Sequence, residues 1–71
     1  MRPLGKLRPG DVVQIRPRFE FLGRSVGLMR CTIVDAIYHP TVIDLWLVDQ
    51  FGWPVMATSD DVVFIRRGVV A

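Results

Sequence analysis

The side chains that could do chemistry in this sequence are few and lie apart along the chain. Cys31 is the only cysteine and His39 the only histidine. An intrachain disulfide is therefore excluded, and a zinc site with about four soft ligands is not expected. Ser25 and Ser59 would have to share one histidine, so no hydrolase triad is indicated. We predict a protein with no catalytic residues, no cofactor and no metal.

Two carboxyl groups, Asp35 and Asp44, are predicted to meet in a hairpin. A turn at His39-Pro40 would place them opposite each other, and like charges directly across a strand pair are unfavourable. Three interpretations are open: a bulge that shifts the register, an arginine between the carboxylates, or a metal or acid–base pair. Asp60 and Asp61 are instead expected to cap a single helical turn at residues 58–61.

Cations alternate with aromatic side chains in residues 16–24. Guanidinium groups neutralise phosphates, and phenylalanine rings offer platforms for unpaired bases. This pattern predicts a surface for RNA or single-stranded nucleic acid made of Arg16, Arg18, Phe19, Phe21 and Arg24. In the other interpretation the two phenylalanines pack inward and the arginines are only solvated. The net charge of +2 is too small for strong non-specific duplex binding.

The elements that would position these residues are short strands. No stretch shows a convincing helical period, and apolar runs alternate with Gly, Pro and Asp turns from Gly10 onward. Eleven valines favour pleated surfaces. The predicted strands are residues 11–16, 28–38, 41–49, 54–57 and 62–66, with a long loop at 17–27 and turns at 39–40 and 50–53.

Two short segments carry a resemblance to known families. Residues 10–17, Gly-Asp-Val-Val-Gln-Ile-Arg-Pro, resemble the Gly-x-x-Val-x-Val start of KOW-type domains in ribosomal and transcription-elongation proteins. They are also similar to the opening of the small peripheral photosystem I subunits that help dock ferredoxin. Residues 59–65 resemble the acidic turn and last strand of both. Gly23 and Gly27, however, are one residue too far apart for the Gly-x-x-Gly-x-Val run of KOW domains.

The strand layout and the resemblance together predict an all-β fold. We expect a single five-stranded SH3-like barrel over residues 10–67, with a short helical turn before the last strand. A flexible basic N-terminal arm, residues 1–9, and a C-terminal tail, residues 68–71, would flank it.

The central hairpin is predicted to be apolar on both faces, whereas a half-buried antiparallel sheet is polar on one. The chain is also rich in apolar residues: 41 of its 71 are Ala, Val, Ile, Leu, Met, Phe, Trp, Cys or Gly, against roughly 45–50% in soluble domains. The surplus predicts a non-catalytic interaction module that self-associates or docks into a larger complex. Cover of this face by the arm or the first loop is the other interpretation. The expected interface residues are Val42, Trp46, Val48, Ile33, Ile37 and, at a turn tip, Trp53.

Charge and cysteine usage complete the expectations. Residues 1–30 hold seven basic and two acidic groups, whereas residues 31–65 hold five Asp and no Lys or Arg. The expected partner is a second copy or another protein, with nucleic acid as the alternative. An enzyme whose site forms only between subunits is a further rival. With no signal-like or membrane-spanning segment expected, a lone cysteine favours the cytoplasm.

Overall fold

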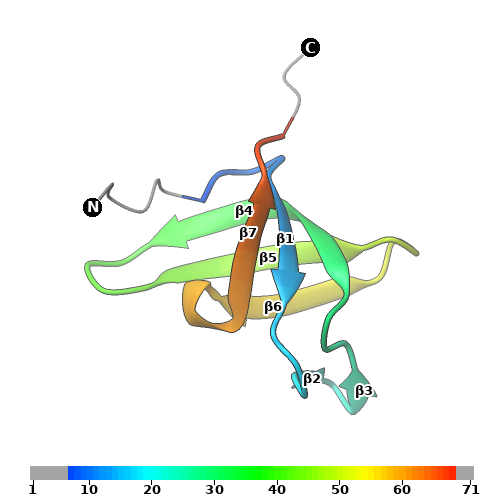
Figure 1. The fold of residues 1–71 in the computed structure, drawn as a ribbon. Helices are drawn as coiled ribbons and strands as arrows, with labels where there is room; N and C mark the ends of the chain where they lie inside the picture. The colour runs from blue at the N-terminus through cyan, green and yellow to red at the C-terminus, as the bar shows by residue number, and fades with distance from the viewer. Residues whose placement is uncertain (1–6, 69–71) are drawn as a thin grey trace.

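The computed structural model describes residues 7–68, and they form antiparallel strands with one short helical turn (Figure 1). The strands are β1 (Val12–Ile15), β2 (Glu20–Phe21), β3 (Arg24–Ser25), β4 (Arg30–Tyr38), β5 (Ile43–Asp49), β6 (Pro54–Thr58) and β7 (Val62–Arg66), with the 3-10 turn η1 (Ser59–Asp61) before β7. The all-β prediction and the helical turn before the last strand are therefore confirmed.

Five strands make one sheet in the order β6-β5-β4-β1-β7, and β2 and β3 form a separate two-stranded sheet. The strands at the two edges, β6 and β7, do not pair with each other in the described part of the chain. The five strands thus form an open sheet and not a closed barrel. In Figure 1, β1 and β7 cross in front of β4, β5 and β6 at a steep angle, so the curved sheet folds over itself.

The core lies between these two parts of the sheet. β1 contributes Val13 and Ile15, both with no exposed surface, and β5 contributes Leu45 and Leu47. The other members are Val26, Cys31, Ile33, Val55, Ala57 and Val62. In β1, β5 and β6 buried residues alternate with less buried ones, as expected for strands with one face on a core.

A bulge at Val34 changes the register partway along the central hairpin. Tyr38 pairs with Ile43 and Asp35 with Trp46, but beyond the bulge Ile33 pairs with Leu47. One extra residue reverses which side chains face inward. Asp35 and Asp44 do not lie opposite each other, because the loop before β5 has four residues, 39–42, where the prediction had a two-residue turn at His39-Pro40. Asp35 pairs with Trp46 and Asp44 with Ile37 on the turn side of the bulge, so the bulge interpretation of the clash is wrong.

The predicted first loop contains the β2–β3 hairpin. Its two central residues, Leu22 (φ 52°) and Gly23 (φ 77°), both have left-handed backbone conformations, as a type I′ turn requires. Arg18 (φ 67°) and Leu28 (φ 68°) are the other non-glycine residues with positive φ in the described chain. All three non-glycine cases thus fall in the segment that joins β1 to β4.

The two ends of the described chain meet at Asp11. This buried carboxylate accepts hydrogen bonds from the backbone N–H groups of Arg8 (3.0 Å) and Gly68 (3.1 Å) and from Arg67 Nη1 (2.7 Å). Leu7 also packs against the core. Residues 7–9 of the predicted flexible arm are thus held in place, whereas residues 1–6 and 69–71 lie outside the described residues.

Candidate functional site

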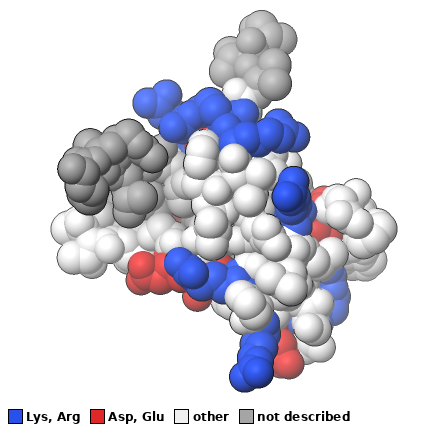
Figure 2. All heavy atoms as spheres, viewed as in Figure 1, with Lys and Arg blue, Asp and Glu red and all other residues white. Residues whose placement is uncertain are grey.

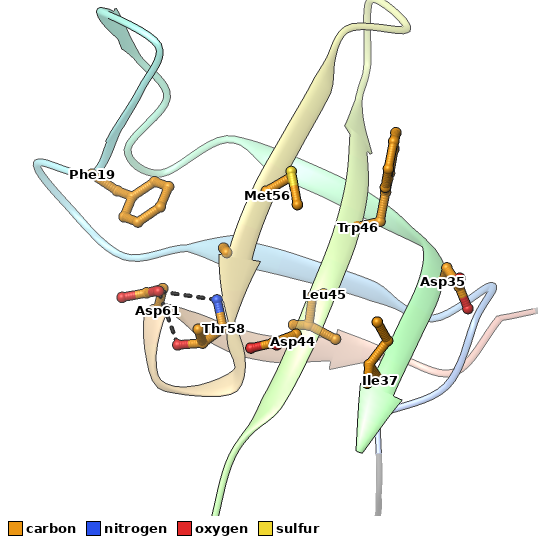
Figure 3. A pocket seen from close by; sticks show the side chains of 10 residues that line it. Phe19, Asp35, Ile37, Asp44, Leu45, Trp46, Met56, Thr58 and Asp61 are labelled. Atoms are coloured by element: carbon orange, nitrogen blue, oxygen red, sulfur yellow. Dashed lines mark hydrogen bonds between the residues drawn. The ribbon is translucent and has the colours of Figure 1, made fainter. Parts of the chain in front are cut away.

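A groove of about 430 Å³ crosses the outer face of β4, β5 and β6 (Figure 3). Three exposed apolar side chains line it: Ile37 from β4, Trp46 from β5 and Met56 from β6. Their exposed fractions are 58%, 48% and 52%. Trp46 pairs with Met56 across β5 and β6, so the two side chains lie side by side on one face.

Phe19 closes the groove on the far side of β6. Figure 3 shows its ring across the free edge of β6 from Met56. Phe19 is half-buried and packs against the core, so this end of the groove is anchored to the fold. The groove therefore has an apolar lining from β4 to the loop before β2.

Three carboxylates, Asp35, Asp44 and Asp61, share the groove with these side chains, and none of the described Lys or Arg residues lines it. Asp35 Oδ1 accepts from the Ala36 N–H, and Asp44 Oδ2 lies 2.9 Å from His39 Nε2. Asp61 Oδ2 accepts from the N–H and hydroxyl of a single residue, Thr58, both at 3.0 Å, which confirms the predicted capping role of Asp61. The groove thus combines apolar side chains with three carboxylates, which give its described lining a negative charge.

The predicted interface residues fall into three places. Ile37, Trp46 and half-buried Val48 lie on the outer face. Ile33 is 1% exposed, so its placement on that face is wrong; the Val34 bulge turns it into the core. Val42 lies in the four-residue loop before β5 and lines a different cavity with Tyr38 and Pro40.

Trp53 is separated from Trp46. The backbone of Trp53 pairs with that of Asp49, since Asp49 N donates to Trp53 O. Side chains alternate along a strand, so Trp53 points to the same side of the hairpin as the core residues, whereas Trp46 points to the outer side. Trp53 extends past the core, is 58% exposed, and lies under the Arg24 guanidinium at 5.5 Å from the ring centroid. The two tryptophans therefore do not form one patch.

Asp49 organises the end of this hairpin. Its buried carboxylate accepts from Arg24 Nη2 at 2.7 Å and from the N–H groups of Phe51 and Trp53. Burial acts to raise the pKa of Asp49, but the hydrogen bonds from Arg24, Trp53 and Phe51 outweigh it and hold the pKa below its usual value. This aspartate is thus ionised, and its role is structural.

Cys31 has no environment for nucleophilic chemistry. Burial and the neighbouring Asp49 carboxylate raise the pKa of the Cys31 thiol from 9.0 to about 11, so the reactive thiolate is scarce near neutral pH. Within residues 7–68 no group of three or more His, Cys, Asp or Glu side chains is placed to hold a metal ion.

The residues of the predicted nucleic-acid surface are largely engaged by the fold. Phe19 and Phe21 are half-buried against the core. Arg24 is paired with Asp49, and Arg16 Nε donates to the Asp60 carbonyl. Arg18 is exposed between β1 and β2. These five residues thus lie in one segment, but the rings of Phe19 and Phe21 are not exposed as a surface on which bases could stack.

A second arginine grouping was not predicted from the sequence. Arg30 and Arg66 line one shallow hollow of about 210 Å³ beside Val12 and Thr32. Pairing of Val12 with both Thr32 and Arg66 brings these positions together. Figure 2 shows basic side chains gathered at the end of the molecule where β7 finishes and β1 begins. Strand pairing between distant segments creates this grouping, so local sequence gave no signal for it.

The sequence matches no protein-family model, and neither a curated protein nor a solved structure matches the chain. In the part of the chain that the structure describes, no helix has the length and apolar character needed to cross a membrane.

Proposed function

We propose that this protein is a non-catalytic interaction module that docks onto another protein surface, a second copy or a different protein, through the outer face of β4–β6. The observation that carries the proposal is that Ile37, Trp46 and Met56, all exposed, line one groove, with Trp46 beside Met56. Contiguous exposed apolar groups of this kind mark interaction sites in soluble domains.

We further propose that the fold is of the SH3-like kind. Its support is the layout: five main strands, a long first loop that carries the β2–β3 hairpin, and a 3-10 turn before the last strand. Pairing of the last strand, β7, with the first, β1, is consistent with that layout. Since folds of this kind host many functions, the layout supports no particular ligand.

The size of the face sets the strength of the interaction. The exposed parts of Ile37, Trp46 and Met56 offer on the order of 300 Å² of apolar area, and their burial would contribute roughly 7 kcal/mol. Association costs of at least about 4 kcal/mol offset much of this. The remaining free energy, at most about 3 kcal/mol, corresponds to a dissociation constant in the millimolar range, so tighter binding requires contacts beyond these three side chains.

Site-specific photocrosslinking in the native cells tests the proposal. A photoreactive phenylalanine analogue replaces Trp46 in one variant and Val63, which is 46% exposed on β7, in the control. We expect a discrete protein adduct from position 46 and none of the same mass from position 63. The adduct mass separates a second copy, at twice the chain mass, from a different protein.

Two results would refute the proposal. One is the absence of any discrete protein adduct from position 46 in a variant that keeps the wild-type circular dichroism spectrum. The other is an identical set of adducts from positions 46 and 63, which would mean that the outer face of β4–β6 has no special role.

Nucleic-acid binding is a second candidate, favoured by the hollow that Arg30 and Arg66 share. Arginine recognises phosphates well, and two arginines beside one hollow would suit a nucleic-acid backbone. The candidate predicts salt-dependent binding of single-stranded RNA that is lost in an Arg30→Ala/Arg66→Ala variant. The control is Arg18→Ala in the first loop, because Arg18 is exposed whereas Arg24 is paired with the buried Asp49. Absence of binding at low salt would remove this candidate, and loss only in the control would move it to the loop.

A further inference from the structure

We infer that the occupant of the β4–β6 groove is a cationic, partly apolar segment of a different protein. The inference rests on the proposed docking function and names the chemistry of the partner. It stands on two features of the groove: the apolar lining of Ile37, Trp46 and Met56, and the carboxylates of Asp35, Asp44 and Asp61.

Within residues 7–68 the charge of the groove is not balanced by its own lining, which contains no Lys or Arg from that range. The arginine salt bridges of the described chain go elsewhere, from Arg24 to Asp49 and from Arg67 to Asp11. His39 is the basic group seen against a groove carboxylate, Asp44. A partner with Lys or Arg beside an apolar anchor would complement both features at once.

Charge also argues against pairing of this face with itself. In a two-fold symmetric contact the same patch lies on both sides of the interface. The carboxylates of Asp35, Asp44 and Asp61 from two copies would then gather in one contact with no arginine between them. Like charges brought together in this way oppose association, so a different, cationic surface is favoured over a second copy in face-to-face contact.

The edge of β6 argues for side-chain docking over addition of a strand. Asp49 N donates to Trp53 O, and this register makes Val55 and Ala57 direct their backbone groups toward β5. The outward backbone positions of the strand are then Pro54, Met56 and Thr58.

Two of these three outward positions cannot donate to a new strand. Pro54 has no N–H, and the Thr58 N–H already donates to Asp61 Oδ2. Met56 is therefore the outward position of β6 whose amide can still donate, so an added strand would receive a single backbone donor along this edge. Affinity must therefore come from side chains that enter the groove.

Selection from a phage-displayed library of random peptides, with fluorescence anisotropy on synthetic copies of the winners, tests the inference. We expect the wild-type protein to select peptides in which Lys or Arg flank an aromatic or branched apolar residue. Asp35→Asn/Asp44→Asn should weaken their binding about 5- to 30-fold and flatten its salt dependence. Asp60→Asn is the matched control, because Asp60 is exposed outside the groove, and should bind as the wild type does.

The outcomes separate the inference from the function on which it rests. Peptides that lose binding in Trp46→Ala but show no cationic preference would overturn the inference and leave the docking face intact. Failure to select any peptide, together with no adduct at position 46, would overturn both. Self-association of the purified protein that Trp46→Glu abolishes would also overturn the inference, because the occupant would then be a second copy.

Discussion

At the scale of single residues, two buried carboxylates tie distant segments together. Asp11 binds Arg67, 56 positions away, and Asp49 binds Arg24, 25 positions away. Neither role could be predicted from the sequence, because an aspartate at the start or end of a strand is usually an exposed turn residue. The cap at Asp61 has a local signal in the sequence, and it was predicted.

The ionised form of Asp49 should make the fold sensitive to acid. Its pKa is lowered in the folded state, so its contribution to the free energy of unfolding is present above its usual pKa and is lost as the pH falls toward the folded value. We expect Asp49→Asn to lower the melting temperature at pH 7. The difference in melting temperature between the variant and the wild type should become smaller below about pH 4. Exposed Asp60→Asn serves as the control, and a constant gap for Asp49→Asn from pH 7 to pH 3 would contradict the account.

The thiol of Cys31 should resist alkylation. A pKa of about 11 in place of 9.0 reduces the thiolate fraction at pH 8, and burial restricts access to the sulfur. We expect iodoacetamide to react at least about ten-fold more slowly with the native protein than with the protein in urea. Equal rates in the two states would show that Cys31 is accessible.

At the scale of elements, the strands could be predicted from apolar alternation and turn residues, whereas their relative register could not. The outer face of β5 was predicted correctly. Ile33 was placed on that face in error, because nothing in the sequence around Val34 marks a bulge. The β2–β3 hairpin was missed for a similar reason: its left-handed turn begins with Leu22, where Asn or Gly would be the usual signal.

The Leu22 turn yields a stability prediction. Leu22 has φ 52° and is 86% exposed, so its side chain adds backbone strain without burial. We expect Leu22→Asn to raise the free energy of unfolding by about 0.5–1 kcal/mol, since asparagine tolerates this conformation and suits an Asn-Gly turn. Leu22→Val should lower it, because branching at Cβ disfavours positive φ. Urea unfolding that ranks valine above asparagine would contradict the assigned turn.

At the scale of the whole molecule, an open, curved sheet is stabilised by a small core and by the hydrogen bonds of Asp11, which join the two ends of the described chain. The prediction of an apolar surplus on the surface rested on composition, and eleven large apolar residues within residues 7–68 are exposed. Which of them form one patch depends on strand register, and so the groove residues Met56 and Asp61 were missed. The alternation in the predicted strand 54–57 was the only available signal for Met56.

The contact that Asp11 makes between the two ends of the described residues should contribute much of the stability. Asp11→Ala removes the acceptor for Arg8, Arg67 and Gly68, and we expect a loss of about 2–4 kcal/mol in urea unfolding. Gly68→Ala provides an independent test, because an added Cβ would lie 2.2 Å from the Gly10 carbonyl oxygen. Wild-type stability of both variants would show that the ends are not part of the cooperative fold.

Acrylamide quenching of Trp46 tests the docking account most directly. The Trp53→Phe variant leaves Trp46 as the only tryptophan, and its fluorescence is measured in dilute protein and then with a saturating peptide from the cationic selection. The account predicts ready quenching in the isolated protein and strong protection on binding. A Trp46 ring that is already shielded in dilute protein, or that stays equally accessible with the peptide bound, would contradict it.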